Sequence, residues 1–103
     1  MKMDKLYKQA QRMQAELALA QEELEKTIFE GASGGGMVKA KVNGQGDVLS
    51  VSISPEVVNK DDVEMLEDLI ISSIKEALRL SREASAKRMN SLTGGLGGFP
   101  GLM

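Results

Sequence analysis

The chain has 103 residues, with 13 basic and 15 acidic side chains, a formal net charge of −2, and neither cysteine nor histidine. This length corresponds to one domain with a modest core, which a second subunit would enlarge. The missing residue types exclude disulfide frameworks, thiolate nucleophiles and the commonest transition-metal ligands, so we expect no enzymatic activity, no metal, no cofactor and no small-molecule substrate.

The first quarter of the chain predicts a long helix. Apolar or small side chains recur every three or four residues, and neither glycine nor proline occurs before Gly31. This spacing is typical of a helix with a narrow apolar seam, which we expect over about residues 4–27. Such a helix is longer than a small sheet, so part of it must pack against another helix. The seam residues are Leu6, Ala10, Met13, Leu17, Ala20, Leu24 and Ile28.

Residues 31–36, with the sequence GASGGG, end the helical pattern. Glycine loses much backbone entropy when it is fixed in a helix, so a run of this kind does not stay helical. A phosphate-binding loop would end in lysine followed by serine or threonine, which this segment lacks. We therefore expect a flexible connector here.

A two-residue period follows the glycines. Apolar and polar side chains alternate in residues 37–42 and again in residues 48–54, which predicts two strands with one buried face each. The intervening NGQG of residues 43–46 suits a tight turn, so the two strands should form an antiparallel hairpin. Residues 27–30 predict a third strand. The expected buried side chains are Val38, Ala40, Val42, Leu49, Val51 and Ile53.

A second helix is predicted over about residues 61–88, after Pro55 has ended the last strand. Asn59 or Asp61 can cap it, and its charges follow the helix dipole, acidic at the start and basic at the end. Its apolar face is wide enough to contact both the sheet and the first helix. Residues 90–103 hold five glycines without periodicity, so we expect a flexible tail after a domain of residues 1–89.

The basic side chains are concentrated in two segments. Residues 1–12 and residues 75–88 each carry +3, which leaves −8 for the remainder. Because the first helix enters the sheet and the second leaves it, antiparallel packing brings both segments to the end farthest from the sheet. A two-fold dimer would present two such ends as a clamp for a polyanion. The candidate phosphate-binding residues are Lys2, Lys5, Lys8, Arg12, Lys75, Arg79, Arg82, Lys87 and Arg88.

The two basic segments are also compatible with roles that involve no nucleic acid. Cations at a helix C-terminus suit the dipole by themselves, whereas cations near an N-terminus do not, which favours a functional role for residues 1–12. The few aromatic side chains offer no platform for stacking single-stranded bases, so duplex DNA is the favoured nucleic acid. The alternative is a helical protein-interaction or chaperone-like clamp, which exposed apolar side chains at the arm ends would favour.

Several short segments carry a family resemblance when they are taken together. In order along the chain they are KQAQ at 8–11, MQ at 13–14, GASGGGMV at 31–38, NG at 43–44, ISP at 53–55, EMLEDLI at 64–70 and LTGGL at 92–96. As a set they resemble the YbaB/EbfC family of nucleoid-associated proteins. The resemblance implies an α+β fold of order α-β-β-β-α, with two long helices flanking a small antiparallel sheet.

The same resemblance implies a tweezer-like homodimer that binds double-stranded DNA, alters its conformation and takes part in nucleoid organisation and gene regulation. The N-terminus lacks the apolar run of a signal peptide, and no segment approaches the length of a membrane span. We therefore expect a cytoplasmic protein of the nucleoid without a membrane partner.

Overall fold

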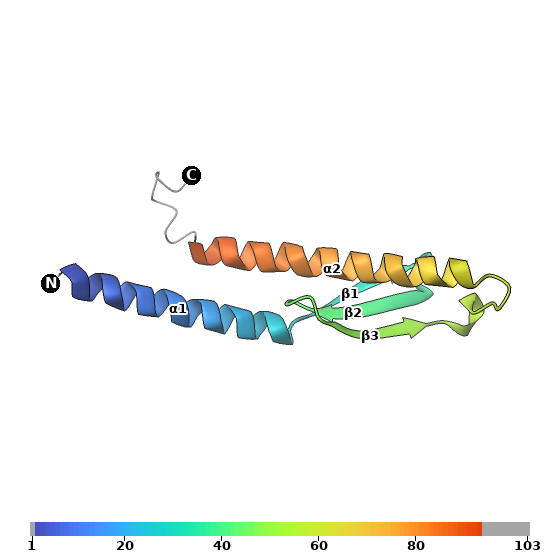
Figure 1. Ribbon diagram of the computed structural model, residues 1–103, viewed down its shortest axis with the longest axis horizontal. Coiled ribbons are helices and arrows are strands. Elements are labelled where there is room, and N and C mark those ends of the chain that lie inside the picture. Colours follow the sequence, from blue (N-terminus) through green and yellow to red (C-terminus); the bar gives the residue numbers. More distant parts are fainter. Residues whose placement is uncertain (1, 94–103) are drawn as a thin grey trace.

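The computed structural model describes residues 2–93, which form a helix, three strands and a second helix (Figure 1). The elements are α1 (Lys2–Lys26), β1 (Ile28–Ser33), β2 (Val38–Asn43), β3 (Val48–Ile53) and α2 (Val63–Thr93), with 3-10 turns at Gly34–Gly36 and Pro55–Val57. The strands are antiparallel neighbours in the order β1-β2-β3. The predicted α-β-β-β-α fold, including its third strand, is confirmed.

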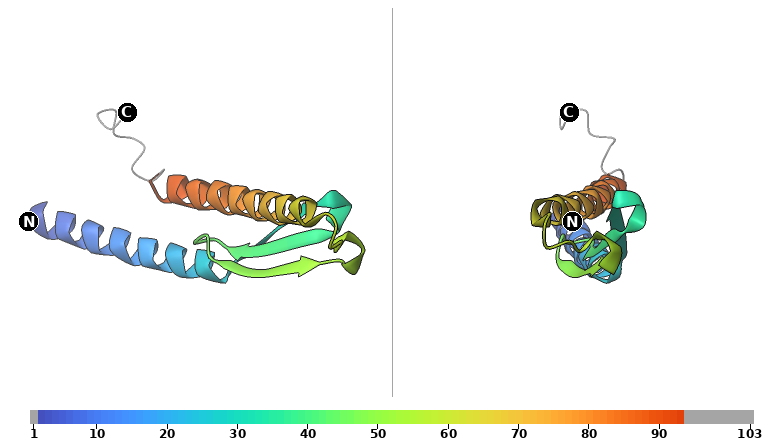
Figure 2. Two further views of the ribbon diagram at one scale, coloured as in Figure 1. Left: turned by 45° about the vertical axis from the view of Figure 1, so that its right-hand side comes forward. Right: turned by 90° about the vertical axis from the view of Figure 1, so that its right-hand side faces the viewer.

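The molecule is an elongated rod of 72 × 25 × 16 Å. One half consists of α2 packed against β1 and β2, and α1 continues away from the sheet at the other end, antiparallel to α2 (Figure 2). The core lies between the sheet and α2, where Val38, Ala40 and Val42 of β2 and Ala77 of α2 are fully buried. These are the β2 side chains that the two-residue period predicts.

Gly31 sets the close approach of α2 to the sheet. A Cβ atom at this position would lie 2.2 Å from the carbonyl oxygen of Ser73, so no other residue fits without moving the helix. Two serine hydroxyls hold the contact at either end, because Ser33 donates to the carbonyl of Leu69 and Ser81 donates to that of Asn43. The expected flexible connector is therefore wrong, since its first half belongs to β1.

The hairpin turn between β2 and β3 also holds the end of α1. Gly44 donates its backbone N–H at 2.7 Å to the carbonyl of Leu24, which also accepts from Thr27 at 3.2 Å, so the turn is bonded to the last turn of the helix. The side-chain oxygen of Asn43 accepts from the backbone N–H groups of Gln45 and Asp47, each at 3.0 Å. The turn is thus a fixed joint between the sheet and α1.

The second helix differs from its predicted bounds at both ends. Asp62 caps it, since its Oδ1 accepts from the backbone N–H of Met65 at 3.2 Å, whereas Asn59 caps the preceding turn by accepting from Asp61. The helix runs to Thr93 rather than to residue 88, so residues 90–93 of the expected tail are helical. The rest of that tail, residues 94–103, lies outside the described residues.

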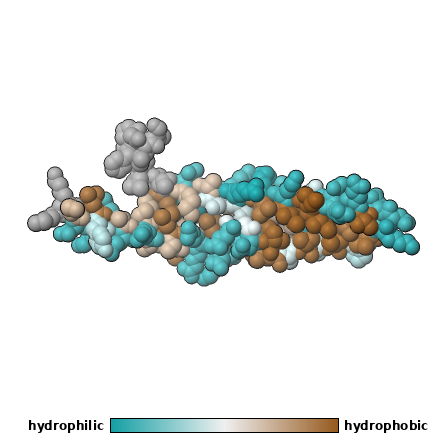
Figure 3. Space-filling model, in the orientation of Figure 1, coloured by the Kyte–Doolittle hydropathy of each residue, from teal (hydrophilic) through white to brown (hydrophobic). Residues whose placement is uncertain are grey.

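The predicted burial of β3 is wrong for a single chain. Every residue of this strand is exposed, including Val51 and Ile53, because α2 covers β1 and β2 but does not reach the third strand. The register also shifts between Lys41 and Val42, so Val48 rather than Leu49 lies opposite a core residue. A broad apolar area therefore remains open over the sheet half of the molecule (Figure 3).

Candidate nucleic-acid interface

The N-terminal half of α1 forms a projecting arm with a basic stripe. Lys5, Lys8 and Arg12 are spaced three and four residues apart, which places them on one face of the helix. All three side chains are exposed, and none of them forms an ion pair with the described part of the chain. Lys2, the fourth candidate of this segment, is the first residue of the helix. We call Lys5, Lys8 and Arg12 the arm stripe.

The arm stripe faces the same side of α1 as Glu23. Lys5 and Glu23 are 18 residues apart, which corresponds to five full turns, so their side chains leave the helix in the same direction. Glu23 contacts Arg88 of α2. The α1 helix extends beyond the described end of α2, so its N-terminal part projects past that helix (Figure 1).

The basic residues of α2 do not gather at the same point. Lys75, Arg79 and Arg82 share one face of the helix, roughly opposite the face that Ala77 and Ser81 turn towards the sheet. Lys75 and Arg79 therefore lie over the sheet half, on the outer surface. Of the five candidates on α2, Arg88 contacts the root of the α1 arm through Glu23, and Arg82 lines a groove beside it.

Even these two are displaced from the arm stripe along the rod. Arg88 lies level with Glu23, which follows Arg12 by eleven residues or about 16 Å of helix. The expectation of a single basic tip is thus wrong in its geometry. The structure instead separates a basic stripe on the arm from an arginine at its root.

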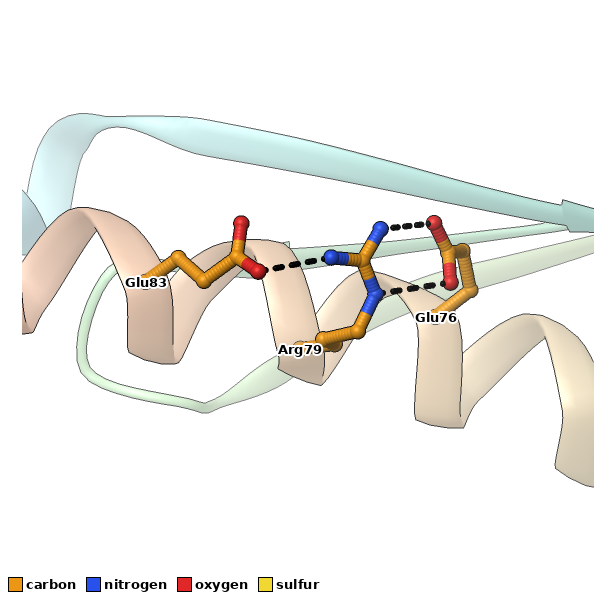
Figure 4. Close-up of polar contacts among 3 residues, drawn as sticks. All are labelled: Glu76, Arg79 and Glu83. Atoms are coloured by element: carbon orange, nitrogen blue, oxygen red, sulfur yellow. Dashed lines mark hydrogen bonds and ion pairs between the residues drawn. The ribbon is translucent and has the colours of Figure 1, made fainter.

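Arg79 is held by two carboxylates of its own helix (Figure 4). Its Nε and Nη2 atoms lie 3.1 and 2.6 Å from the two carboxylate oxygens of Glu76, and its Nη1 lies 2.7 Å from Glu83. The hydrogen bond from Arg79 lowers the pKa of Glu76, and the same bond raises the pKa of the guanidinium. With all three guanidinium nitrogens engaged by two carboxylates, Arg79 is less available to phosphate than an arginine with one such partner or none.

Arg82 has a different setting. Its exposed side chain lines a groove of about 830 Å³ between the end of α1, the β2–β3 turn and α2. Leu24, Leu78 and Met89 contribute apolar walls, and Gln45 contributes a polar one. Within residues 2–93, Arg82 forms no ion pair.

The chain matches the model of the YbaB/EbfC DNA-binding family over residues 1–96. It belongs to this family. It is 52% identical over 97 residues to a nucleoid-associated protein of Caldanaerobacter subterraneus, covering 94% of this chain and 86% of the relative. It is 51% identical over 100 residues to a nucleoid-associated protein of Clostridium perfringens, covering 97% and 88%.

A solved structure supports the fold of this YbaB/EbfC chain. The crystal structure of an uncharacterized protein from Helicobacter pylori matches it with a TM-score of 0.64 at 24% identity, over 76% of this chain and 90% of the other. Family and relatives together identify a nucleoid-associated DNA-binding protein. Across residues 2–93, neither helix combines the length and the apolar character needed to cross a membrane.

The sequence-based prediction names the basic residues of the site but omits the acidic residues that pair with them. The spacing of Glu76, Arg79 and Glu83 at three and four residues in a helix could have indicated that group from the sequence. The pair of Glu23 and Arg88 joins residues 65 positions apart, so only the packing of α1 beside α2 reveals it.

Proposed function

We propose that this chain binds duplex DNA as a homodimer, through contacts to phosphate, and alters DNA conformation in the nucleoid. The proposal rests on the arm stripe, three exposed cations on one face of a projecting helix that form no ion pair within residues 2–93, in a member of a DNA-binding family. Contacts of lysine and arginine with phosphate give salt-sensitive affinity without reading the base sequence.

The open apolar face supports the homodimer. Val48, Val51 and Ile53 of β3 expose 37–50% of their surface, and Ile71 of α2 exposes 50%. Monomeric proteins rarely expose contiguous apolar areas of this kind, and a two-fold axis is the commonest way to cover one with a second copy. A dimer formed over β3 would carry two α1 arms, as a clamp or bending device requires.

Titration of a fluorescent duplex of about 30 base pairs, long enough for about three helical turns, tests the proposal. The variant replaces the arm stripe with Lys5→Gln, Lys8→Gln and Arg12→Gln, and should weaken binding at least tenfold. The matched control replaces three other exposed lysines, Lys39→Gln, Lys41→Gln and Lys60→Gln, which removes the same charge from the sheet half. Equal losses in both variants would show that net charge, and not the arm, determines binding.

A protein-interaction clamp is the second candidate, because the arm also carries exposed apolar side chains. Met3, Leu6 and Tyr7 expose 80%, 64% and 67% of their surface. A clamp for unfolded proteins would use such groups to hold apolar segments of a client. If that is their role, Leu6→Gln with Tyr7→Gln should abolish suppression of client aggregation and leave DNA binding unchanged.

A further inference from the structure

One ion pair joins the two helices within residues 2–93. The Nε and Nη2 atoms of Arg88 both lie 3.2 Å from one carboxylate oxygen of Glu23. Each other ion pair of the described chain lies within a single helix: Lys26 with Glu22, and Arg79 with Glu76 and Glu83. Among the basic residues that form these ion pairs, Arg88 is the one that pairs with a carboxylate of the other helix.

A phosphate group and the Glu23 carboxylate would make the same contact with Arg88. Both present acceptor oxygens that a guanidinium binds through two N–H groups. Glu23 also lies on the face of α1 that carries the arm stripe, so a DNA backbone tracking this face towards the sheet would pass the exposed Glu16 and then reach Glu23 and Arg88. At Arg88 the Glu23 carboxylate thus occupies the position that a phosphate would take.

The attachment of α1 to the rest of the molecule makes this pair mechanically relevant. Ala20 and Leu24 are the buried residues of α1, and the backbone bond from Gly44 to Leu24 fixes its C-terminal end. The arm has little other contact with α2. The Glu23–Arg88 pair adjoins this attachment, so its loss would leave the contacts of Leu24 in place but remove the ion pair that ties α1 to α2.

Building on the function proposed above, we propose that Glu23 is an internal competitor of phosphate at Arg88. In free protein the pair holds α1 beside α2. On binding, a DNA phosphate takes the guanidinium from Glu23, so the two helices separate and the arm adjusts its angle to the duplex. An exposed ion pair is weak enough for a phosphate to displace it, and it lowers affinity by no more than the strength of the pair.

The test compares two substitutions that each remove one negative charge from neighbouring positions of α1. Glu23→Gln frees Arg88, whereas Glu22→Gln frees only Lys26 of the same helix. We expect Glu23→Gln to tighten binding of a fluorescent 30-base-pair duplex by about two- to fivefold more than Glu22→Gln does, which is the range of exposed ion pairs. The gain should vanish when Arg88→Gln is added. Equal affinities of the two single variants would overturn the proposal.

A second measurement reports the arm without DNA. The chain has no cysteine, so Gln9→Cys with Ser91→Cys places one spin label on each helix. The distribution of distances between the two labels, measured in dimers diluted with unlabelled chain, should broaden in Glu23→Gln and stay narrow in Glu22→Gln. Identical distributions would overturn the proposed hold on the arm. A wild-type chain that fails to bind DNA would contradict the proposed function itself, a result distinct from equal affinities of the two variants.

Discussion

The charged residues of this protein differ mainly in what surrounds each of them. Lys5 and Arg12 project from the arm and pair with no carboxylate of residues 2–93, whereas Arg79 pairs with both Glu76 and Glu83. Charges that look equivalent in the sequence therefore differ in their availability to phosphate. The pairing with Arg79 lowers the pKa of Glu76.

Acid should weaken the α2 helix through Glu76. The pKa of Glu76 is lowered from its usual 4.5 by the hydrogen bond from Arg79, so the pair stabilises the folded state above that pH and the contribution is lost as pH falls through the lowered value. Between about pH 6 and about pH 3, the melting temperature of Glu76→Gln should therefore fall less than that of the wild type. Thermal unfolding followed by circular dichroism measures both. Parallel declines would show that the pair contributes nothing to stability.

Gly31 determines how closely α2 can lie on the sheet. Gly31→Ala forces a methyl group against the backbone of Ser73 and Ala77, and we expect a loss of about 1–3 kcal/mol in the free energy of unfolding. Urea denaturation measures this loss. Ala32→Ser, at the exposed neighbouring position of β1, is the control and should be close to neutral. A neutral Gly31→Ala would contradict the tight contact.

At the scale of elements, sequence periodicity predicts what each segment forms better than what covers it. The hairpin and both helices follow from the change of period and from the turn residues, and the burial of Val38, Ala40 and Val42 follows from alternation. The same alternation fails for Val51, because burial of that face depends on a partner layer that α2 does not supply. The arm stripe could be predicted from helical spacing, but the Glu23–Arg88 pair could not.

The exposure of β3 predicts that a substitution on its apolar face changes the assembly of the protein. Val51 pairs with the buried Ala40 and so lies on the open apolar face, whereas Ser52 pairs with Lys39 on the opposite face. Val51→Glu should shift the protein from dimer to monomer in light scattering, because it places a charge in the interface. Ser52→Glu should remain dimeric. Circular dichroism of both variants separates loss of assembly from unfolding, and a folded, dimeric Val51→Glu would contradict the proposed interface.

At the scale of the whole molecule, the elongated shape keeps the basic arm stripe apart from an acidic segment. The arm stripe lies at one end of a 72 Å rod, and the acidic start of α2 lies at the other (Figure 1). A chain whose net charge is −2 can therefore present a cationic surface to DNA while its remaining surface repels the same polymer. Dimerisation over β3 would set the two arms relative to one another and so determine how a bound duplex bends.

The salt dependence of DNA binding measures how many phosphates the arms engage. If both arm stripes of a dimer engage phosphate, they contribute six cations, which make up about −5 of the slope of log affinity against log salt concentration. Removal of the stripe by Lys5→Gln, Lys8→Gln and Arg12→Gln should make the slope shallower by about 5, because the other cations stay in place. A wild-type slope near zero, or a slope unchanged in this variant, would contradict a phosphate-binding arm.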